Sequence, residues 1–488
     1  MMAVRRAAAW SAASQYASFA IQFATSVIIS RLYLLPADVG LFSIALAAAM
    51  MVAIFQDLGI SRFVVGQPEM RDENLRDYAA VAVALGWLVA GCVALAALPL
   101  AVFYRQPALT GVVLIVAAGY VIMPLGIVPA AMLTRRLDFR ALFLANAGSA
   151  FGGAAIAIAC AAHGAGPAAL AWGMLASALT RVCIVLGYHR ILPRWPRNAA
   201  AIRPLVAFGS SSLVLAASGA VGMRSQDLIV GRLLGLSAVG LFTRASALAG
   251  QLSTLMVGAI NGVFYPAFAH KREAGDDLAE PYLHLVACNT ALNWAAAIAL
   301  AIAAEPVVLL LYGPNWAEVA PLLRWTAIAE VFFVAVPLQM DVPILLGRIR
   351  TLVWINLLDT ALTIGLLVLF ALWGVEAAAI SRIIAAALWF GIYIGYISRL
   401  LGLPLTRLAA VYAGSAIPAA ICAIPLGAAQ WFGWFGGKAM GFAPLLVLSA
   451  AGAMLWLLTV AALRHPAWSE IRLAIVAIPG LRASPAGA

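Results

Sequence analysis

Long apolar stretches separated by short polar connections run along the whole chain. In the first part, stretches long enough to cross a bilayer as helices lie near 9–33, 40–64, 78–103, 109–133, 142–162 and 168–189. After an arginine-rich connection, further stretches lie near 206–231, 239–264, 282–304, 319–346, 353–373, 377–398, 408–432 and 442–463. This pattern predicts an all-α membrane protein with about 14 transmembrane helices.

The basic residues give these helices a direction. If the amino terminus is cytoplasmic, about twenty arginine and lysine residues fall on the cytoplasmic connections, and the outer ends hold only Arg31, Arg105, Arg232 and Lys438. Such an excess of positive charge on the cytoplasmic side is typical of membrane proteins. We therefore expect both termini in the cytoplasm. The first apolar stretch is too long for a signal peptide, so we expect it to be kept as a helix.

Composition excludes several other classes of protein. Hydrophobic residues make up 65% of the 488 and charged residues 10%, with a mean hydropathy of +1.01, whereas about 25% of an average soluble domain is charged. The net charge of +11 does not indicate a nucleic-acid partner, because the basic residues are dispersed among short connections. The five cysteines lie far apart and the five histidines have no metal-binding spacing, so we expect no metal or other cofactor.

A short motif recurs in the two parts of the chain. Arg31-Leu32 is followed by Val39-Gly40-Leu41-Phe42, and Arg232-Leu233 is followed by Val239-Gly240-Leu241-Phe242. Both copies lie between two predicted helices, and six helices separate them. An even number of helices per half makes the halves parallel, which is an arrangement that transporters use to rock two lobes around a central site.

This repeat predicts the domain organisation. We expect an amino-terminal lobe of six helices over residues 1–197 and a second lobe of six helices over 198–402. Two further helices and a cytoplasmic tail would then occupy 403–488.

Several motifs resemble, in their order and spacing, those of a known family. They are Ser30-Arg31-Leu32 with Pro36-Ala37-Asp38-Val39-Gly40-Leu41-Phe42, then Gln56-Asp57-Leu58-Gly59-Ile60, Phe208-Gly209-Ser210-Ser211-Ser212, Asp227-Leu228-Ile229-Val230-Gly231-Arg232-Leu233-Leu234-Gly235, Phe264-Tyr265-Pro266-Ala267-Phe268, Tyr312-Gly313-Pro314-Asn315-Trp316 and Ala320-Pro321-Leu322-Leu323. Over most of its length the chain is similar to the polysaccharide transporter flippases of the multidrug/oligosaccharidyl-lipid/polysaccharide exporter superfamily.

This resemblance implies a function. A flippase of this kind moves an undecaprenyl-diphosphate-linked oligosaccharide from the cytoplasmic to the periplasmic leaflet of the bacterial inner membrane by alternating access, for capsule, exopolysaccharide or O-antigen synthesis. Its partners would be the lipid-linked oligosaccharide and the surrounding lipids, together with a polysaccharide polymerase and glycosyltransferases. The last two helices would be accessory, and the protein would not be an enzyme.

Charged residues within the predicted helices are the candidates for a substrate site, because a diphosphate must cross the hydrocarbon region. Arginine suits a diphosphate because its guanidinium donates paired hydrogen bonds and keeps its charge. We assign Arg31, Arg224, Arg244 and Asp227 to this site, since the first, seventh and eighth helices line the cleft in the family that the chain resembles. The alternatives are that these arginines reach the interface or form salt bridges, and that Arg224 and Asp227, three residues apart, neutralise each other. Arg62, Arg181, Arg324 and Arg382 also lie within predicted helices and receive no role.

A second polar group suggests coupling to an ion gradient. Asn356, Asp359 and Thr363 recur at helical spacing in the eleventh predicted helix, and with Asp227 they offer oxygen ligands for Na⁺ or a carboxylate for H⁺. The alternative is a polar stripe that faces a hydrated cavity. Neutral residues such as Gln15, Ser18, Gln22 and Asn146 can contact sugars or pair helices.

Two other functions are compatible with a chain of this kind. A drug or cation exporter of the same superfamily would favour acidic residues over arginines in its cavity. A polyprenyl-dependent glycosyltransferase would need catalytic acids in a sizeable outer connection, and connections such as 163–167 and 374–376 are too short for that. The sequence does not specify the sugar composition of the substrate or the oligomeric state.

Overall fold

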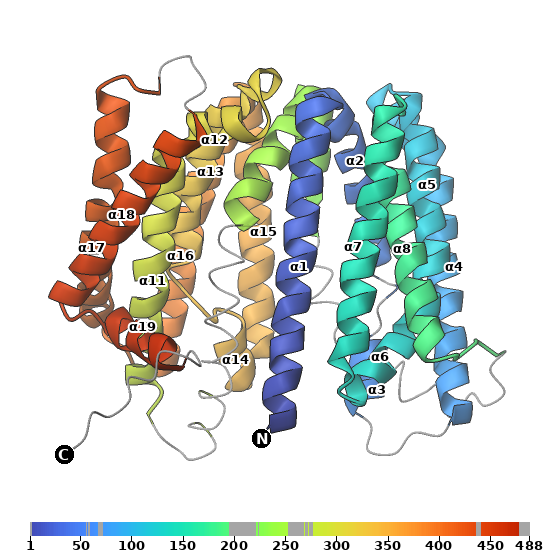
Figure 1. Cartoon of the computed structure of the whole chain (residues 1–488), viewed down its shortest axis with the longest axis horizontal. Coiled ribbons are helices and arrows are strands. Elements are labelled where there is room, and N and C mark those ends of the chain that lie inside the picture. Colours follow the sequence, from blue (N-terminus) through green and yellow to red (C-terminus); the bar gives the residue numbers. More distant parts are fainter. Residues whose placement is uncertain are drawn as a thin grey trace. The chain divides into compact units, whose positions relative to one another are not determined.

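The protein consists of helices and turns throughout the part that the structure describes. The computed structural model describes residues 2–54, 56, 59–66, 72–194, 221–222, 224–251, 268, 272, 277–435 and 441–477. These residues form two compact units, Met1–Thr243 and Arg244–Ala488. The predicted all-α class is confirmed. Figure 1 shows the long helices of each unit running side by side.

The described part of the first unit contains eight α-helices of defined bounds and a short 3₁₀ turn. They are α1 (Met2–Leu32), α2 (Pro36–Ala53), α3 (Ile60–Gly66), α4 (Asp72–Tyr104), α5 (Ala108–Ile122), the 3₁₀ turn η1 (Met123–Gly126), α6 (Ile127–Arg135), α7 (Phe139–Ala162) and α8 (Ala168–Tyr188). Residues 224–234 and 236–243 of this unit are also helical. Helix α1 packs against α7, α7 against α8, α8 against α5, and α5 against α4 and α2.

Two predicted helices of the first unit are interrupted. The apolar stretch at 40–64 becomes α2 and α3, with Gly59 at a positive φ of 68° just before α3. The stretch at 109–133 is broken by η1, where Pro124 lacks the N–H that a continuous helix needs. Both interruptions occur at residues that disfavour regular helix.

The second unit begins with the helical residues 244–251, and its other described helices follow. They are α11 (Ala279–Ile302), α12 (Ala304–Leu311), the 3₁₀ turn η2 (Pro314–Trp316), α13 (Val319–Phe333), α14 (Asp341–Leu345), α15 (Ile349–Ala371), α16 (Val375–Leu401), α17 (Leu405–Trp431), α18 (Phe442–Ala462) and α19 (Pro466–Ala477). The predicted stretch at 319–346 divides into α13 and α14, and Leu338 between them has a φ of +53°. Helix α16 packs against α13 and α15, and α11 packs against α13 and α17.

Ten helical segments among the described residues are long and apolar enough to cross a membrane. The chain is therefore a multi-span membrane protein. The number of fourteen stays a prediction, because residues 206–220 and 252–264, which belong to two of the predicted stretches, lie outside the described residues. The boundaries of the predicted lobes likewise stay predictions.

Candidate functional site

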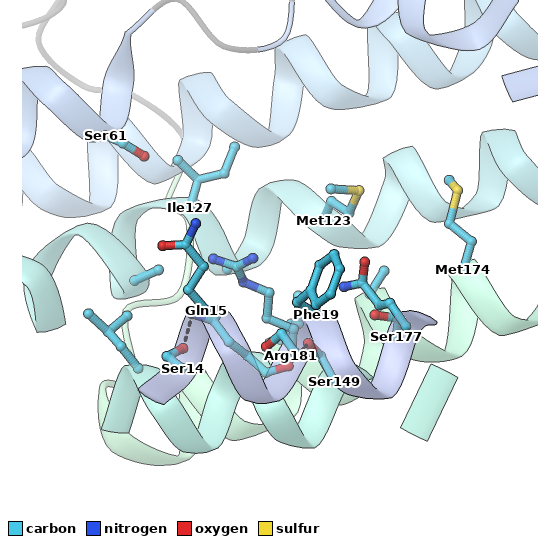
Figure 2. A pocket seen from close by; sticks show the side chains of 18 of the residues that line it. Ser14, Gln15, Phe19, Ser61, Met123, Ile127, Ser149, Met174, Ser177 and Arg181 are labelled. Carbon is cyan, nitrogen blue, oxygen red and sulfur yellow. Dashed lines mark hydrogen bonds between the residues drawn. The ribbon is translucent and has the colours of Figure 1, made fainter. Parts of the chain in front are cut away.

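A cavity of about 840 Å³ lies inside the first unit. Its walls come from α1, α7 and α8, from the segment of η1 and α6, and from residues around α3 (Figure 2). These helices are adjacent in the bundle, since α1 packs against α7 and α7 against α8. The cavity is therefore lined by helices that pack against one another in the first unit, and it is partly open.

Helix α1 presents a polar face to this cavity. The lining residues are Ser11, Ser14, Gln15, Ser18 and Gln22, which recur at intervals of three and four residues and so share one side of the helix. On α7, the side-chain amide of Asn146 donates a hydrogen bond to the hydroxyl of Ser14 over 3.0 Å. The predicted neutral residues thus have two roles. Asn146 joins α7 to α1 through this hydrogen bond, and Gln15, Ser18 and Gln22 line the cavity.

Arg181 on α8 contributes the positive charge of the cavity. It is the only charged residue among the described lining residues. Figure 2 shows the side chains of Arg181 and Gln15 reaching into the same space. The Arg181 side chain is solvent-accessible, and within the described residues it has no carboxylate partner. A fixed cation surrounded by hydroxyl and amide groups can bind an anionic, hydroxyl-rich ligand.

Comparison with known proteins shows which family has this architecture. The family model described as "Polysaccharide biosynthesis protein" matches residues 28–321. The chain belongs to this polysaccharide biosynthesis family. It is 25% identical over 367 residues to the succinoglycan biosynthesis transport protein ExoT of Rhizobium meliloti, covering 74% of this chain and 73% of that protein. It is also 22% identical over 384 residues to an uncharacterized membrane protein in the cps region of Klebsiella pneumoniae, covering 78% of this chain and 79% of that protein.

Solved structures extend the comparison to the fold. The lipid II flippase MurJ in an inward closed conformation matches 93% of this chain and 98% of its own, with a TM-score of 0.75 and 10% identity. An inward-facing multidrug resistance MATE transporter of the MOP superfamily matches 78% of this chain and 95% of its own, with a TM-score of 0.60 and 16% identity. The chain thus has the fold of this superfamily, as its motifs predict.

In this member of the polysaccharide biosynthesis family, the predicted substrate residues do not line the cavity. Arg31 lies exposed in the last turn of α1. Arg224 is part of the helix at 224–234, and its charge acts on the phenol of Tyr120 in α5. The carboxylate of Asp227 accepts a hydrogen bond from Thr243 over 3.3 Å. The role assigned to these residues stays a prediction.

Arg244 belongs to the second unit and contacts aromatic rings. Its guanidinium carbon lies 5.9 Å from the ring centroid of Tyr312 and 5.9 Å from that of Trp316. Both aromatic side chains are buried. These rings come from the motif Tyr312-Gly313-Pro314-Asn315-Trp316, so this motif supplies a cation–π site for Arg244. The contact favours a structural role for Arg244 over the predicted contact with substrate.

The predicted ion-coupling residues of the second unit lie together on α15. Asn356 is buried, while Asp359 and Thr363 are half-buried one turn apart. The charge of Asp359 acts on Tyr393 of the neighbouring helix α16, and Thr363 lies beside the Asp359 carboxylate. Asp227 belongs to the other unit, so α15 by itself offers one carboxylate with two neutral oxygens. Coupling to Na⁺ or H⁺ stays a prediction.

Arg382 and Glu330 form an ion pair inside the second unit. A nitrogen of Arg382 on α16 lies 3.2 Å from an oxygen of Glu330 on α13, and the side chains are 20% and 10% exposed. The other terminal nitrogen donates to the hydroxyl of Ser246 over 3.3 Å, and the guanidinium lies 5.8 Å from the ring of Phe333. Arg382 is therefore bound on several sides.

Sequence reasoning did not assign Arg181 to a site, although it noted the residue as an arginine within a helix. The available signal was the spacing of Ser177 and Arg181, which lie one turn apart in the otherwise apolar span at 168–188. The polar face of α1 gave a matching signal on a second helix. Nothing in the sequence showed that the two faces meet.

Proposed function

We propose that this protein flips an oligosaccharide carried on undecaprenyl diphosphate from the cytoplasmic to the periplasmic leaflet of the bacterial inner membrane. Membership in the polysaccharide biosynthesis family supports this proposal. So does the similarity to a protein named as a succinoglycan biosynthesis transport protein. The product would be a capsule, an exopolysaccharide or O-antigen.

The cavity around Arg181 is the observation that carries the proposal. A sugar headgroup cannot cross hydrocarbon unless its hydroxyl groups find hydrogen-bonding partners. The serines and glutamines of α1 offer such partners, and Arg181 offers a permanent positive charge to a phosphate or an acidic sugar. The lipid tail would stay in the bilayer outside the bundle.

In the proposed cycle, the two lobes alternate between a state open to the cytoplasm and a state open to the periplasm. Both termini stay in the cytoplasm. No bound cofactor takes part, and Asp359 with Asn356 and Thr363, together with Asp227, would couple the cycle to Na⁺ or H⁺. A polymerase and glycosyltransferases would act before and after the flip, as partners outside the bundle.

A cation exporter is the main rival, since the fold is shared with a multidrug transporter. Such a protein would need an acidic group in its cavity to bind a cation. Among the described residues that line this cavity, Arg181 is the only charged one, and its sign opposes a cationic drug. A glycosyltransferase is the second rival. It would need catalytic acids in a sizeable outer connection, whereas the connection between α7 and α8 has only the residues 163–167.

Reconstitution into vesicles tests the proposal. Undecaprenyl-diphosphate oligosaccharide with a labelled sugar is placed in both leaflets, and a membrane-impermeant glycosidase then digests the outer leaflet. With active protein nearly all the label becomes digestible, whereas without protein only the outer share does. A folded protein that leaves the inner share intact, while it moves a cationic dye, would favour the exporter instead.

A further inference from the structure

The two copies of the repeated motif contact each other inside the first unit. The α carbon of Gly40 faces the backbone carbonyl of Leu236, and the α carbon of Gly240 faces the backbone carbonyl of Pro36. Pro36 corresponds to Leu236 and Gly40 to Gly240 in the repeat, at the same offset of 200 residues. Each copy therefore offers the other the same two atoms, as in an interface formed about a two-fold axis.

This crossing leaves no room for a side chain. A β carbon on either glycine would overlap the carbonyl oxygen of the other copy, and a β carbon on Gly40 would also lie 3.0 Å from the backbone nitrogen of Gly240. Backbones this close together permit Cα–H···O contacts. Such a contact can form in both directions only if both copies carry glycine at this position. We call this contact the Gly40–Gly240 crossing.

The residues around the crossing are closely packed. Val39 is 3% exposed and Val239 is 0% exposed. Nearby, Gly231 packs against the side chain of Ile44. The hydroxyl of Tyr104 donates a hydrogen bond to the carbonyl of Leu228 over 2.9 Å. The two copies are therefore closely packed against each other in the described conformation.

The predicted orientation places the crossing at the outer end of the helices. Arg31 and Arg232, which precede the two copies, are two of the few basic residues on the outer side. The polar side chains of the cavity lie in the same unit, on α1, α7 and α8. A substrate that leaves toward the periplasm must pass this end.

We propose that the Gly40–Gly240 crossing closes the periplasmic end of the transport path and that it separates once in each transport cycle. The inference rests on the proposed flippase function for its place in the cycle. Closure by backbone contact needs no ion pair, so breaking it leaves no buried charge without a partner. The reciprocal arrangement also lets both copies separate by one rotation about a shared axis.

Spin labels can measure the separation directly. Leu35 and Leu233 are exposed residues that flank the crossing, one in each copy. In protein with Cys92, Cys160 and Cys183 replaced by alanine, Leu35→Cys and Leu233→Cys carry the labels, and pulsed electron resonance gives their distances. We expect a short and a long distance. In Gly40→Ala or Gly240→Ala the short-distance population should fall roughly tenfold, because the added methyl prevents close approach.

Gly91→Ala is the matched control, since a β carbon at Gly91 on α4 would meet nothing within 4 Å. It should leave both distances as they are. Persistence of the short distance in both glycine variants would overturn the proposal. So would a single short distance in wild-type protein that is turning over.

A second measurement keeps both glycines. In the Val239→Cys variant, a thiol of similar size replaces a valine side chain that is buried in the crossing. A membrane-impermeant maleimide is then added from the outer side. Labelling should accelerate when lipid-linked oligosaccharide is supplied, and a rate that never changes during transport would contradict the proposal. If the distances respond to Gly40→Ala but no oligosaccharide is ever flipped, the crossing stands and the proposed cargo fails.

Discussion

Arg181 in the first unit and Arg382 in the second are both arginines within apolar helices, yet their surroundings differ. Arg382 contacts Glu330, Ser246 and Phe333, each at a distance expected for a favourable interaction. Arg181 faces a cavity of about 840 Å³ whose other polar groups are neutral. One charge is balanced inside the protein, and the other is left for something that enters the cavity.

In a membrane bundle, the surroundings of a charged side chain separate structural from functional charges. A charge that is matched by the protein gains nothing from a ligand, and removal of its partner leaves it buried and uncompensated. A charge that faces open, polar space costs free energy to place there and recovers it when an anion binds. Disruption of the Arg382 ion pair in the second unit should therefore lower stability, whereas replacement of Arg181 in the first unit should lower transport.

The largest expected effect comes from breaking the buried pair. Glu330→Ala leaves the Arg382 guanidinium without its carboxylate, which typically costs about 3–5 kcal/mol of stability. Thermal unfolding of the purified protein in detergent measures the loss. Glu280→Ala is the matched control, since Glu280 pairs with Arg407 at the surface, where the Glu280 side chain is 64% exposed and that of Arg407 is 57% exposed. It should cost less than about 1 kcal/mol.

Replacement of Arg181 should act on transport instead. Arg181→Gln removes charge-assisted hydrogen bonds worth about 1.5–3 kcal/mol, so flipping of the oligosaccharide should slow by roughly 10 to 100-fold. Arg181→Lys keeps the charge and should retain part of the rate. Thermal unfolding should stay close to that of wild type, and a large fall in stability with normal transport per folded molecule would make Arg181 a structural residue.

Sequence and structure favour different roles for Arg244. Its two cation–π contacts predict that Arg244→Met lowers stability by about 1–2 kcal/mol. A double-mutant cycle with Tyr312→Leu should show a coupling of about 0.5–1 kcal/mol. A transport defect as large as that of Arg181→Gln, without loss of stability, would restore Arg244 to the substrate site.

The smallest expected effect is a dependence of stability on pH that arises from His465, directly before the first residue of α19. The Nδ1 of His465 accepts a hydrogen bond from the backbone N–H of Ala467 over 3.3 Å, and its Nε2 lies 3.3 Å from the hydroxyl of Ser415. Burial lowers the pKa of His465 below its ordinary value of 6.5, with the nearby His284 acting in the same direction. The unfolded chain then binds the proton more readily, so stability should fall as pH drops from about 6.5.

His465→Gln should remove this acid sensitivity while it keeps a hydrogen-bonding side chain. Thermal unfolding at several values between about pH 7.5 and 5, which bracket the ordinary histidine pKa, measures this dependence of stability on pH. An unchanged slope in His465→Gln would mean that other groups cause the dependence. His284→Gln is the companion variant, because it removes the second histidine that lowers the pKa of His465. It also removes the pair that His284 forms with Glu470 over 3.0 Å.

The fold could be predicted from hydropathy because each spanning helix must be predominantly apolar over a length that crosses the hydrocarbon core. The interruptions could not be placed reliably, although Pro124 and Gly59 mark them, because proline and glycine also occur inside continuous membrane helices. Pro99 is one example, since α4 continues through it. Local signals of this kind depend on how neighbouring helices satisfy the backbone.

The candidate site was harder to predict than the fold. The assignment of Arg31, Arg224 and Arg244 rests on their positions on helices that line the cleft in the family that the chain resembles, and none of them lines the described cavity. Arg181 had equal standing in the sequence as an arginine within a helix. Only the packing of α8 beside α7, and of α7 beside α1, brings Arg181 opposite the serines and glutamines of α1.

The Gly40–Gly240 crossing also bears on the origin of the chain. Because each copy of the motif supplies both a glycine and a carbonyl, two separate half-length chains would form the same contact as a symmetric homodimer. Fusion of two such genes would keep the contact without a single new residue. It would also tie the two copies together afterwards, since a larger side chain in one half can be tolerated only if the other half moves its backbone.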